Sequence, residues 1–232
     1  MPLLPRVRHA PGLRFTPVDY AALRQAGARA YLLNFAADRD EPGQLPASRY
    51  LDVGERLGLA ERYKCRIRSP WYRVPVVPTG SLMLSKRSHR YPRVILNCVD
   101  AYTTDTIYRG RMLPAAPGGT QRRAPDLVAA FHNSLTLLTA EIEGRSFGGG
   151  VLELVPSEVG RLLVAVPESF RDELDRLDSI ARSASSAGIE PVVDETDRLL
   201  TKHVPGLGTS SLERLREARL MLLKRRLDRG AG

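Results

Sequence analysis

Two short motifs in the sequence carry residue types that could act on a nucleotide base. The segment Ser69-Pro70-Trp71-Tyr72 places a polar side chain and a proline before aromatic rings. In a tetrapeptide of this kind, the polar oxygen and a proline carbonyl accept hydrogen bonds from an amino group, and an aromatic ring stacks on the flipped base. The segment Leu51-Asp52-Val53-Gly54, followed by Gly58, has the pattern that begins a glycine-rich cofactor loop.

The spacing of these motifs excludes such a site. In a doubly wound sheet the cofactor loop follows the first strand and the tetrapeptide follows the fourth, and each βαβ unit needs about 30 residues. Gly54 and Ser69 are only 15 residues apart. Trp71 also replaces the second proline of the tetrapeptide, and no apolar strand precedes the loop. The sequence therefore predicts no Rossmann cofactor domain, and neither catalytic nor cofactor-binding residues.

Other kinds of site also lack their patterns. The run Gly148-Gly149-Gly150 lacks the Lys-Ser/Thr of a phosphate loop, so it predicts a helix stop and a tight turn. No uncharged run approaches the roughly 18 residues of a membrane-spanning helix. We expect no metal site, because no metal-ligand spacing connects the four histidines, His9, His89, His132 and His203. The two cysteines, Cys65 and Cys98, are typical of reduced thiols in a cytoplasmic protein.

The charge is concentrated in one segment. The 232 residues include 35 Lys+Arg and 26 Asp+Glu, which gives a net charge of +9. Thirteen basic residues lie between Arg62 and Arg123 and only Asp100 and Asp105 oppose them, so this stretch carries +11 and the rest of the chain −2. Aromatic residues are interleaved with these cations, which favours a nucleic-acid partner over a merely solvated sheet face. They are Trp71, Tyr72, Tyr91, Tyr102 and Tyr108.

The residue patterns predict an α+β fold, in which a central basic β-rich segment is flanked by helices on both sides. Alternation and β-branched residues predict strands within 63–68, 74–77, 82–84, 94–98 and 102–108. Apolar spacing and caps predict helices within 16–35, 48–57, 126–143, 156–164, 167–187 and 210–227. The first of these helices begins at Thr16-Pro17, an N-cap followed by a proline.

Several segments resemble, in the same order, the C-terminal half of adenine-specific (N6) DNA methyltransferases of restriction–modification systems. They are 63–75, 93–97, 133–138 with Glu141, 144–154 and 156–159, within a similarity that covers about 48–166. In that family this half is the target-recognition, or specificity, domain, and the catalytic half lies before it. The resemblance implies an N-terminal helical segment at 1–47, a DNA target-recognition domain at 48–166 and a C-terminal helical segment at 167–232.

The expected function is DNA binding that gives sequence specificity to a catalytic methyltransferase subunit supplied in trans. S-adenosylmethionine is expected on that partner, and the location is expected to be cytoplasmic and nucleoid-associated. Arginines can pair bidentately with guanine or phosphate, whereas other cations position the duplex without reading its sequence. Trp71 either packs beneath the site or stacks on DNA. The candidate DNA-binding residues are Lys64, Arg66, Arg68, Trp71, Tyr72, Arg73, Lys86, Arg87, Arg90, Arg93, Asn97, Thr103, Thr104 and Arg109.

Two other functions stay open at this point. One is a non-catalytic module that binds RNA or takes part in protein assembly. The other is a folded remnant whose helices, above all Ser211–Leu227, serve only protein–protein association. Because the catalytic half of the resembling family lies before the half seen here, the chain is expected to be a separate subunit, a split product or a truncated remnant.

Overall fold

The computed structural model describes residues 1–35, 46–184 and 188–230. Contacts divide the chain into two compact units: unit 1 consists of Met1 and Tyr31–Pro78, and unit 2 of Pro2–Ala30 and Thr79–Gly232. Unit 2 is therefore built from two stretches of sequence, with unit 1 inserted between them. The boundaries predicted at residues 47/48 and 166/167 enclose the expected target-recognition domain, and both boundaries stay a prediction.

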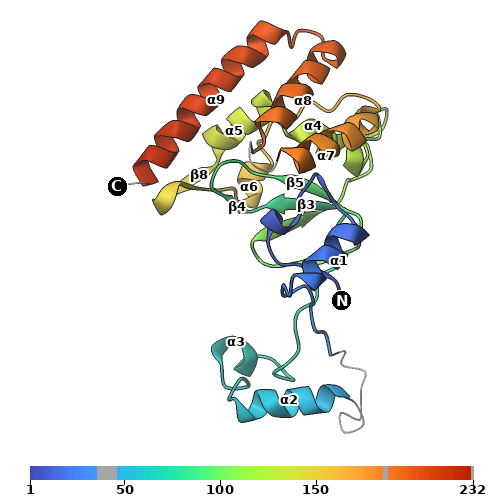
Figure 1. Ribbon diagram of the computed structural model, residues 1–232, viewed down its shortest axis with the longest axis vertical. Helices are drawn as coiled ribbons and strands as arrows, with labels where there is room; N and C mark the ends of the chain where they lie inside the picture. Colours follow the sequence, from blue (N-terminus) through green and yellow to red (C-terminus); the bar gives the residue numbers. More distant parts are fainter. Residues whose placement is uncertain (36–45, 185–187, 231–232) are drawn as a thin grey trace. The chain divides into compact units, whose positions relative to one another are not determined.

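A four-stranded sheet forms the centre of unit 2 (Figure 1). Its strands, in spatial order, are β2 (Arg14–Phe15), β5 (Val94–Asn97), β3 (Leu82–Ser85) and β7 (Ile107–Gly110). Strand β3 is antiparallel to both of its neighbours, whereas β2 joins β5 in parallel. Strands β3 and β5 are apolar on both faces because each face covers a separate core.

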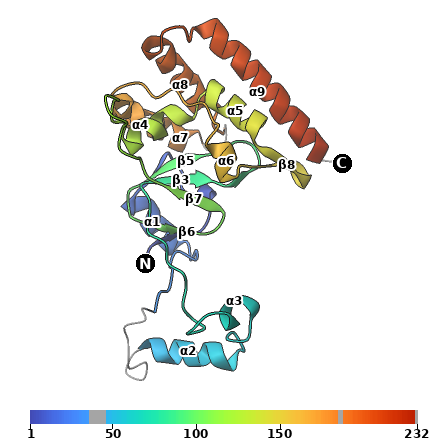
Figure 2. The same ribbon diagram turned by 180° about the vertical axis from the view of Figure 1, so that it is seen from behind.

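The first core lies between the sheet and a layer of helices (Figures 1 and 2). Leu82 and Val94 of the sheet belong to the same cluster as Phe131, Leu177 and Val193. Those three residues come from three different helices, so the cluster ties these helices to the sheet. The helices are α4 (Ala124–Phe131), α7 (Leu174–Ser183) and α8 (Glu190–His203), with the 3₁₀ turn η4 (Phe170–Glu173).

The second core lies under the other face of the sheet and is closed by the N-terminal segment. Met83 and Ile95 point into it and meet Leu4, Phe15 and Leu23. The N-terminal elements are β1 (Leu3–Leu4), η1 (Val7–His9) and α1 (Pro17–Gln25), and β1 pairs in parallel with β6 (Tyr102–Thr103). Residues 2–30 therefore complete a core whose other half lies about 80 residues later in the chain.

Local capping explains where two helices begin and end. Thr16 caps α1, since its hydroxyl accepts a hydrogen bond from the backbone N–H of Asp19. Helix α1 ends at Gln25, before Gly27 with φ +70°, and not near residue 35 as expected. The continuous helix expected over 126–143 is divided, because Asn133 accepts from Thr136 N–H and caps a new helix, α5 (Ser134–Glu143).

A second, three-stranded sheet in unit 2 has the order β4-β9-β8. The strands are β4 (Arg87–Ser88), β9 (Val151–Glu153) and β8 (Arg145–Phe147); the 3₁₀ turn η3 (Gly148–Gly150) joins β8 to β9, and the short helix α6 (Pro156–Val159) follows. The last helix, α9 (Thr209–Gly230), lies along α5 and reaches η3. Arg226 of α9 is 5% exposed and pairs with Glu141 of α5 through Nε–Oε2 (2.8 Å) and Nη2–Oε1 (2.7 Å).

Unit 1 contains two helices, α2 (Pro46–Arg56) and α3 (Tyr63–Arg66). At its start, the N-terminal amine donates to the carbonyl of Leu32, and Leu32 N–H donates to the carbonyl of Met1. Aromatic rings provide much of its apolar contact: Phe35 meets Tyr72 edge to face at 6.0 Å between ring centroids. A small unit of this kind has few buried side chains, so its surface dominates its properties.

The predicted fold class is confirmed: the protein is α+β with helices at both ends, and its described residues form no Rossmann sheet. The strand expected at residues 63–68 is wrong, because Arg66 N–H bonds to the carbonyl of Arg62 and closes the helical turn α3. Its alternation of cations has no buried face that would fix a strand register. Residues 74–77 form no strand, and the one strand expected over 102–108 is two, β6 and β7.

Candidate nucleic-acid interface

Unit 1 holds the densest group of basic side chains around α3. They are Arg62, Lys64, Arg66, Arg68 and Arg73; all are exposed except Arg68, which is half-buried. No salt bridge joins any of the five to a described carboxylate; the ion pairs found in the described part of the chain lie in unit 2. The Arg66 guanidinium lies 5.6 Å from the centroid of the Tyr63 ring, three residues earlier on the same turn.

The aromatic part of the predicted site is built into unit 1. Trp71 Nε1 donates to Glu55 Oε1 at 3.2 Å, and the indole packs on α2 at Gly54. A Cβ on Gly54 would lie 2.6 Å from the ring, so glycine is needed there for packing. Tyr72 meets Trp71 edge to face at 5.7 Å. The structure shows that Trp71 packs within unit 1, where it supports the basic segment. Stacking of Trp71 on DNA stays a prediction.

An apolar pocket of about 340 Å³ lies within unit 1. Tyr50 of α2 and Leu57, which follows that helix, line it together with Leu33, Trp71 and Cys65. Arg68 brings a cation to the lining. The side chains of Tyr50 and Leu57 remain 60% and 67% exposed. The pocket can therefore accept an apolar or planar group beside a positive charge.

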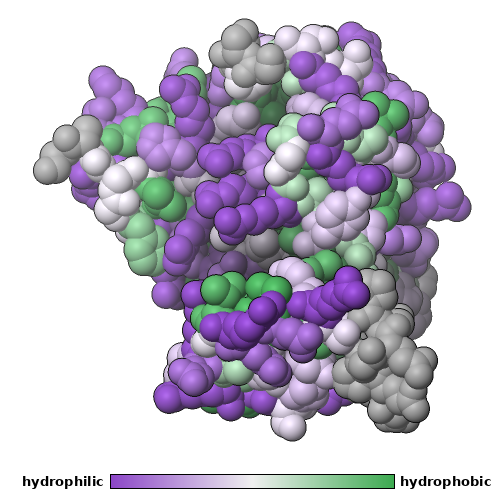
Figure 3. Space-filling view, turned by 60° about the horizontal axis from the view of Figure 1, so that its bottom comes forward, coloured by the Kyte–Doolittle hydropathy of each residue, from purple (hydrophilic) through white to green (hydrophobic). Residues whose placement is uncertain are grey.

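Four more candidate residues lie on the surface of unit 2, namely Lys86, Arg87, Arg90 and Arg109. Lys86 Nζ and Arg87 Nη2 approach Glu153 at 3.4 and 3.1 Å. Burial acts to raise the pKa of the Glu153 carboxyl, but hydrogen bonds and charge from Arg87 and Lys86 outweigh it and lower the pKa. Figure 3 shows hydrophilic side chains over most of the face that it presents, with hydrophobic ones in separate small areas.

Arg93 has a structural role in unit 2. Its Nη1 donates to the carbonyl of Ala10 at 2.9 Å, and its Nη2 donates to the carbonyl of Gly12 at 2.6 Å. Burial lowers the pKa of the guanidinium. Nearby, His132 is fully buried, and burial together with the charge of Arg93 lowers its pKa to about 3. Arg93 therefore ties the N-terminal segment to the sheet, a role that its charge alone does not reveal.

Three predicted polar contacts are also engaged within the fold. Asn97 is 9% exposed; its Nδ2 donates to the carbonyls of Gly80 and Ala101, each at 3.0 Å. Thr103 donates to the carbonyl of Ile107 and Thr104 to that of Pro5. Contacts of these residues with DNA stay predictions, but their side chains already hold strands and loops together.

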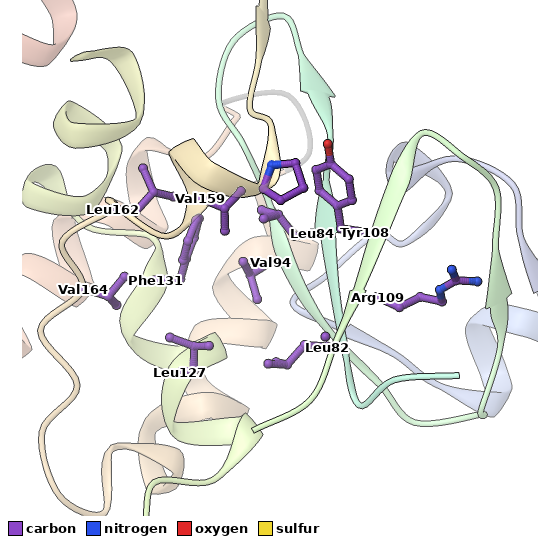
Figure 4. A pocket seen from close by; sticks show the side chains of 12 residues that line it. Leu82, Leu84, Val94, Tyr108, Arg109, Leu127, Phe131, Val159, Leu162 and Val164 are labelled. Atoms are coloured by element: carbon purple, nitrogen blue, oxygen red, sulfur yellow. The ribbon is translucent and has the colours of Figure 1, made fainter. Parts of the chain in front are cut away.

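A larger apolar pocket, of about 390 Å³, lies in unit 2 between the sheet and α4 (Figure 4). Leu84, Val94 and Phe131 line it, and Figure 4 shows the Arg109 side chain directed away from it. The lining contains no carboxylate, histidine or cysteine. Tyr108 brings a phenol hydroxyl to a lining that is otherwise mostly apolar, so the pocket is suited to holding an apolar group.

The structure thus separates the predicted residues into two sets. Lys64, Arg66, Arg68, Trp71, Tyr72 and Arg73 come together in unit 1, and the other eight belong to unit 2. The sequence predicts a short strand at 151–154, where β9 lies, but it did not predict β8, where Arg145 and Phe147 are exposed. The signal was present, because an apolar residue before three glycines predicts a hairpin tip as readily as a helix stop.

Two kinds of feature are absent from residues 1–35, 46–184 and 188–230. No three His, Cys, Asp or Glu side chains there gather in a way that could hold a metal ion. None of the helices there is both long and apolar enough to cross a membrane.

With these features in place, a comparison of the sequence with protein families becomes informative. Residues 1–201 match the family described as type II methyltransferase M.Eco57I, C-terminal domain. The chain belongs to this family. The match confirms the resemblance to the C-terminal half of a restriction–modification methyltransferase, and it is wider than the stretch 48–166 that carries the quoted motifs. Helix α9 lies beyond the matched residues. No curated protein and no solved structure gave a significant match.

Proposed function

We propose that this M.Eco57I-type C-terminal domain binds duplex DNA as the target-recognition subunit of an adenine-specific methyltransferase. The observation that carries the proposal is the group of five cations at residues 62–73, which have no carboxylate partner among the described residues. An unpaired surface cation retains its full charge for an external phosphate. DNA neutralised by such groups releases counterions, which drives binding.

The residues of unit 1 differ in their proposed roles. Arg66 and Arg73 are exposed and long enough to reach either a guanine edge or a phosphate, to which a guanidinium binds bidentately. Lys64, a point charge on the same turn as Arg66, contacts phosphate. Arg68 lies in the lining of the apolar pocket, where a planar group would meet its guanidinium.

The surface cations of unit 2, of which Lys86 is half-buried and the other three are exposed, extend the contact to more phosphates. They are Lys86, Arg87, Arg90 and Arg109. Arg93 and Asn97 do not belong to the proposed interface, since backbone carbonyls occupy their donors.

Methyl transfer itself is assigned to a catalytic subunit acting in trans. This chain holds neither a cofactor loop of the required spacing nor the complete tetrapeptide, and Gly54 and Trp71 of the two partial motifs pack against each other. S-adenosylmethionine is therefore proposed to bind the catalytic subunit. A cytoplasmic, nucleoid-associated location follows from this role.

The test is the salt dependence of duplex DNA binding by the full chain. If six or seven phosphates are contacted, log Kd plotted against log salt concentration should have a slope of about 5 to 6, and affinity should fall about a thousandfold between 50 and 200 mM salt. A flat response would overturn the proposal. Structured RNA that competes better than duplex DNA would indicate an RNA-binding module in its place.

A further inference from the structure

The hairpin of β8 and β9 is an edge element of unit 2 (Figures 1 and 2). Its register pairs Arg145 with Glu153 and Phe147 with Val151, and β9 pairs on its other side with β4. All three residues of β8 are exposed. Leu152 of β9, by contrast, is 1% exposed and packs against Gly144, so one face of the hairpin is anchored and the other is open to solvent.

The tip of the hairpin has an apolar side chain followed by bare backbone. Phe147 is 48% exposed and belongs to neither core, so its place on an open strand does not stabilise the fold by burial. Gly149 has φ +72°, which favours glycine. Gly148 has no positive φ, and a Cβ there would meet nothing within 4 Å. Neither backbone conformation nor packing within this chain requires glycine at 148. A partner that approaches this backbone closely would require it, because a side chain there would keep the partner away.

Cations surround this tip, and buried carboxylates orient two of them. The Arg87 guanidinium lies 5.8 Å from the Phe147 ring centroid, and its Nη2 pairs with Glu153 at 3.1 Å. Arg145 pairs with Glu158 through Nε at 2.5 Å, while its side chain stays 62% exposed. Glu153 and Glu158 are 5% and 3% exposed. Each buried carboxylate therefore holds an arginine whose side chain is largely exposed, 58% for Arg87 and 62% for Arg145.

Helix α9 fixes the hairpin in place. Arg226 donates to the carbonyls of His89 and Gly150, and Leu227 approaches the Gly150 Cβ position at 3.2 Å. The same end of the helix carries exposed basic side chains. Lys224, Arg225 and Arg229 lie on the last turns of α9, where Asp228 is the one acid, and exposed Arg90 follows β4. The local charge therefore fits a polyanion.

We propose that the β8–β9 hairpin is a second DNA-binding element, which enters the minor groove of the duplex with Phe147 wedged against a base step. Arg87 and Arg145 bind the flanking phosphates, and Gly148–Gly149 let the backbone approach the sugars closely. Apolar wedges of this kind unstack a base step and bend DNA. This inference rests on the proposed DNA binding. Arg87 already belongs to the predicted site, whereas Arg145, Phe147 and the glycines lie outside it.

The test compares wild type with Phe147→Ala, Phe147→Leu and Gly148→Val, using the full chain and a random-sequence duplex labelled with a dye at each end. Energy transfer between the dyes should report a bend with wild type and with Phe147→Leu, which keeps a wedge. Phe147→Ala should abolish the bend and weaken binding about tenfold. Gly148→Val should weaken binding without changing the melting temperature. Leu113→Ala, which also truncates an exposed apolar side chain (76%), is the matched control and should change neither reading.

The outcomes separate the two proposals. If wild type binds the duplex and Phe147→Ala binds and bends it equally well, the hairpin is not a DNA contact and the proposed function stands. If wild type bends DNA and Leu113→Ala loses as much binding as Phe147→Ala, the effect is not specific to the wedge and the inference fails. If wild type does not bind duplex DNA even at low salt, the proposed function and this inference both fail.

Discussion

The two units use arginine in opposite ways. In unit 2, Arg182 pairs with Asp19 and Asp178 at 2.7 Å each, and Arg226 pairs with buried Glu141. In the described part of unit 1, Arg66 and its neighbours have no carboxylate within salt-bridge distance. The charge of a sequence therefore divides into cations consumed by the fold and cations left for a ligand, and only the partners in the structure distinguish them.

The largest effect is expected at a buried pair of unit 2. Arg226→Met should lower the free energy of unfolding by about 3–5 kcal/mol, because Glu141 would be left buried without its partner. Urea denaturation followed by helical circular dichroism measures this loss. The double variant Arg226→Met/Glu141→Gln should recover part of it, since no charge then stays buried. A loss within about 0.5 kcal/mol for Arg226→Met would break the comparison, because such a loss is typical of a surface substitution.

The second effect is expected in unit 1 and concerns binding, not stability. Lys64→Glu/Arg66→Glu should weaken duplex DNA binding about a hundredfold at moderate salt, since two proposed phosphate contacts become repulsive. The melting temperature should stay unchanged, because both side chains are exposed and unpaired with any described acid. Binding is measured by fluorescence anisotropy of a labelled duplex.

The matched control for this double variant is Lys202→Glu/Arg214→Glu. These residues are exposed on α8 and α9, and the pair makes the same change in net charge. The control should weaken binding only a fewfold, through long-range electrostatics. If it weakens binding as much as the α3 variant does, net charge and not the α3 surface governs affinity.

The smallest effect is the acid sensitivity that His132 gives to unit 2. The pKa of this buried histidine is about 3, below the ordinary 6.5, so the folded protein keeps it neutral where the unfolded chain binds a proton. Its contribution to stability is complete above pH 6.5 and is lost as the pH falls from there towards 3. Between pH 6.5 and 5 the loss should be about 2 kcal/mol.

Urea titrations at a series of pH values measure this dependence. His132→Gln removes this titrating group and should make the profile above pH 5 shallower. His9, whose pKa is also lowered by burial and by the charges of Arg8 and Arg6, should account for the dependence that is left there. The Asp19 carboxyl has a pKa below its ordinary 3.8, so its contribution changes only at lower pH and does not overlap this window. An equally steep profile in the variant would show that other groups cause the acid sensitivity.

Parts of the fold with a strong local signal were predicted from the sequence. The runs that became β3 and β5 are apolar on both faces, which indicates a strand between two cores. Thr16 with the following proline indicates a helix start. The sequence did not predict helix α8, which begins at Glu190, just after the helix expected over 167–187. The strand predicted at 63–68 is wrong because these six residues, none of them fully buried, fit a helical turn as well as a strand.

The sequence predicts where basic residues are concentrated along the chain, but it does not predict which of them share a free surface. The position of Arg66 within a dense basic segment can be read from the sequence. The sequence does not show that Arg93 reaches carbonyls more than 80 residues away, at Ala10 and Gly12. Likewise, the sequence alone indicates a core residue at Phe147, and only the fold shows that its edge strand is exposed to solvent. Long-range contacts decide which polar donors are occupied, and local pattern does not contain them.

The insertion of unit 1 within unit 2 has a consequence for how such proteins diverge. The chain leaves unit 2 after Ala30 and re-enters it at Thr79, while the sheet and both cores are built from residues on either side of the insertion. Substitutions between Tyr31 and Pro78 are therefore under little constraint from those cores. If unit 1 recognises DNA as we propose, substitutions in this segment can change the target preference while the sheet and the two cores of unit 2 stay as they are.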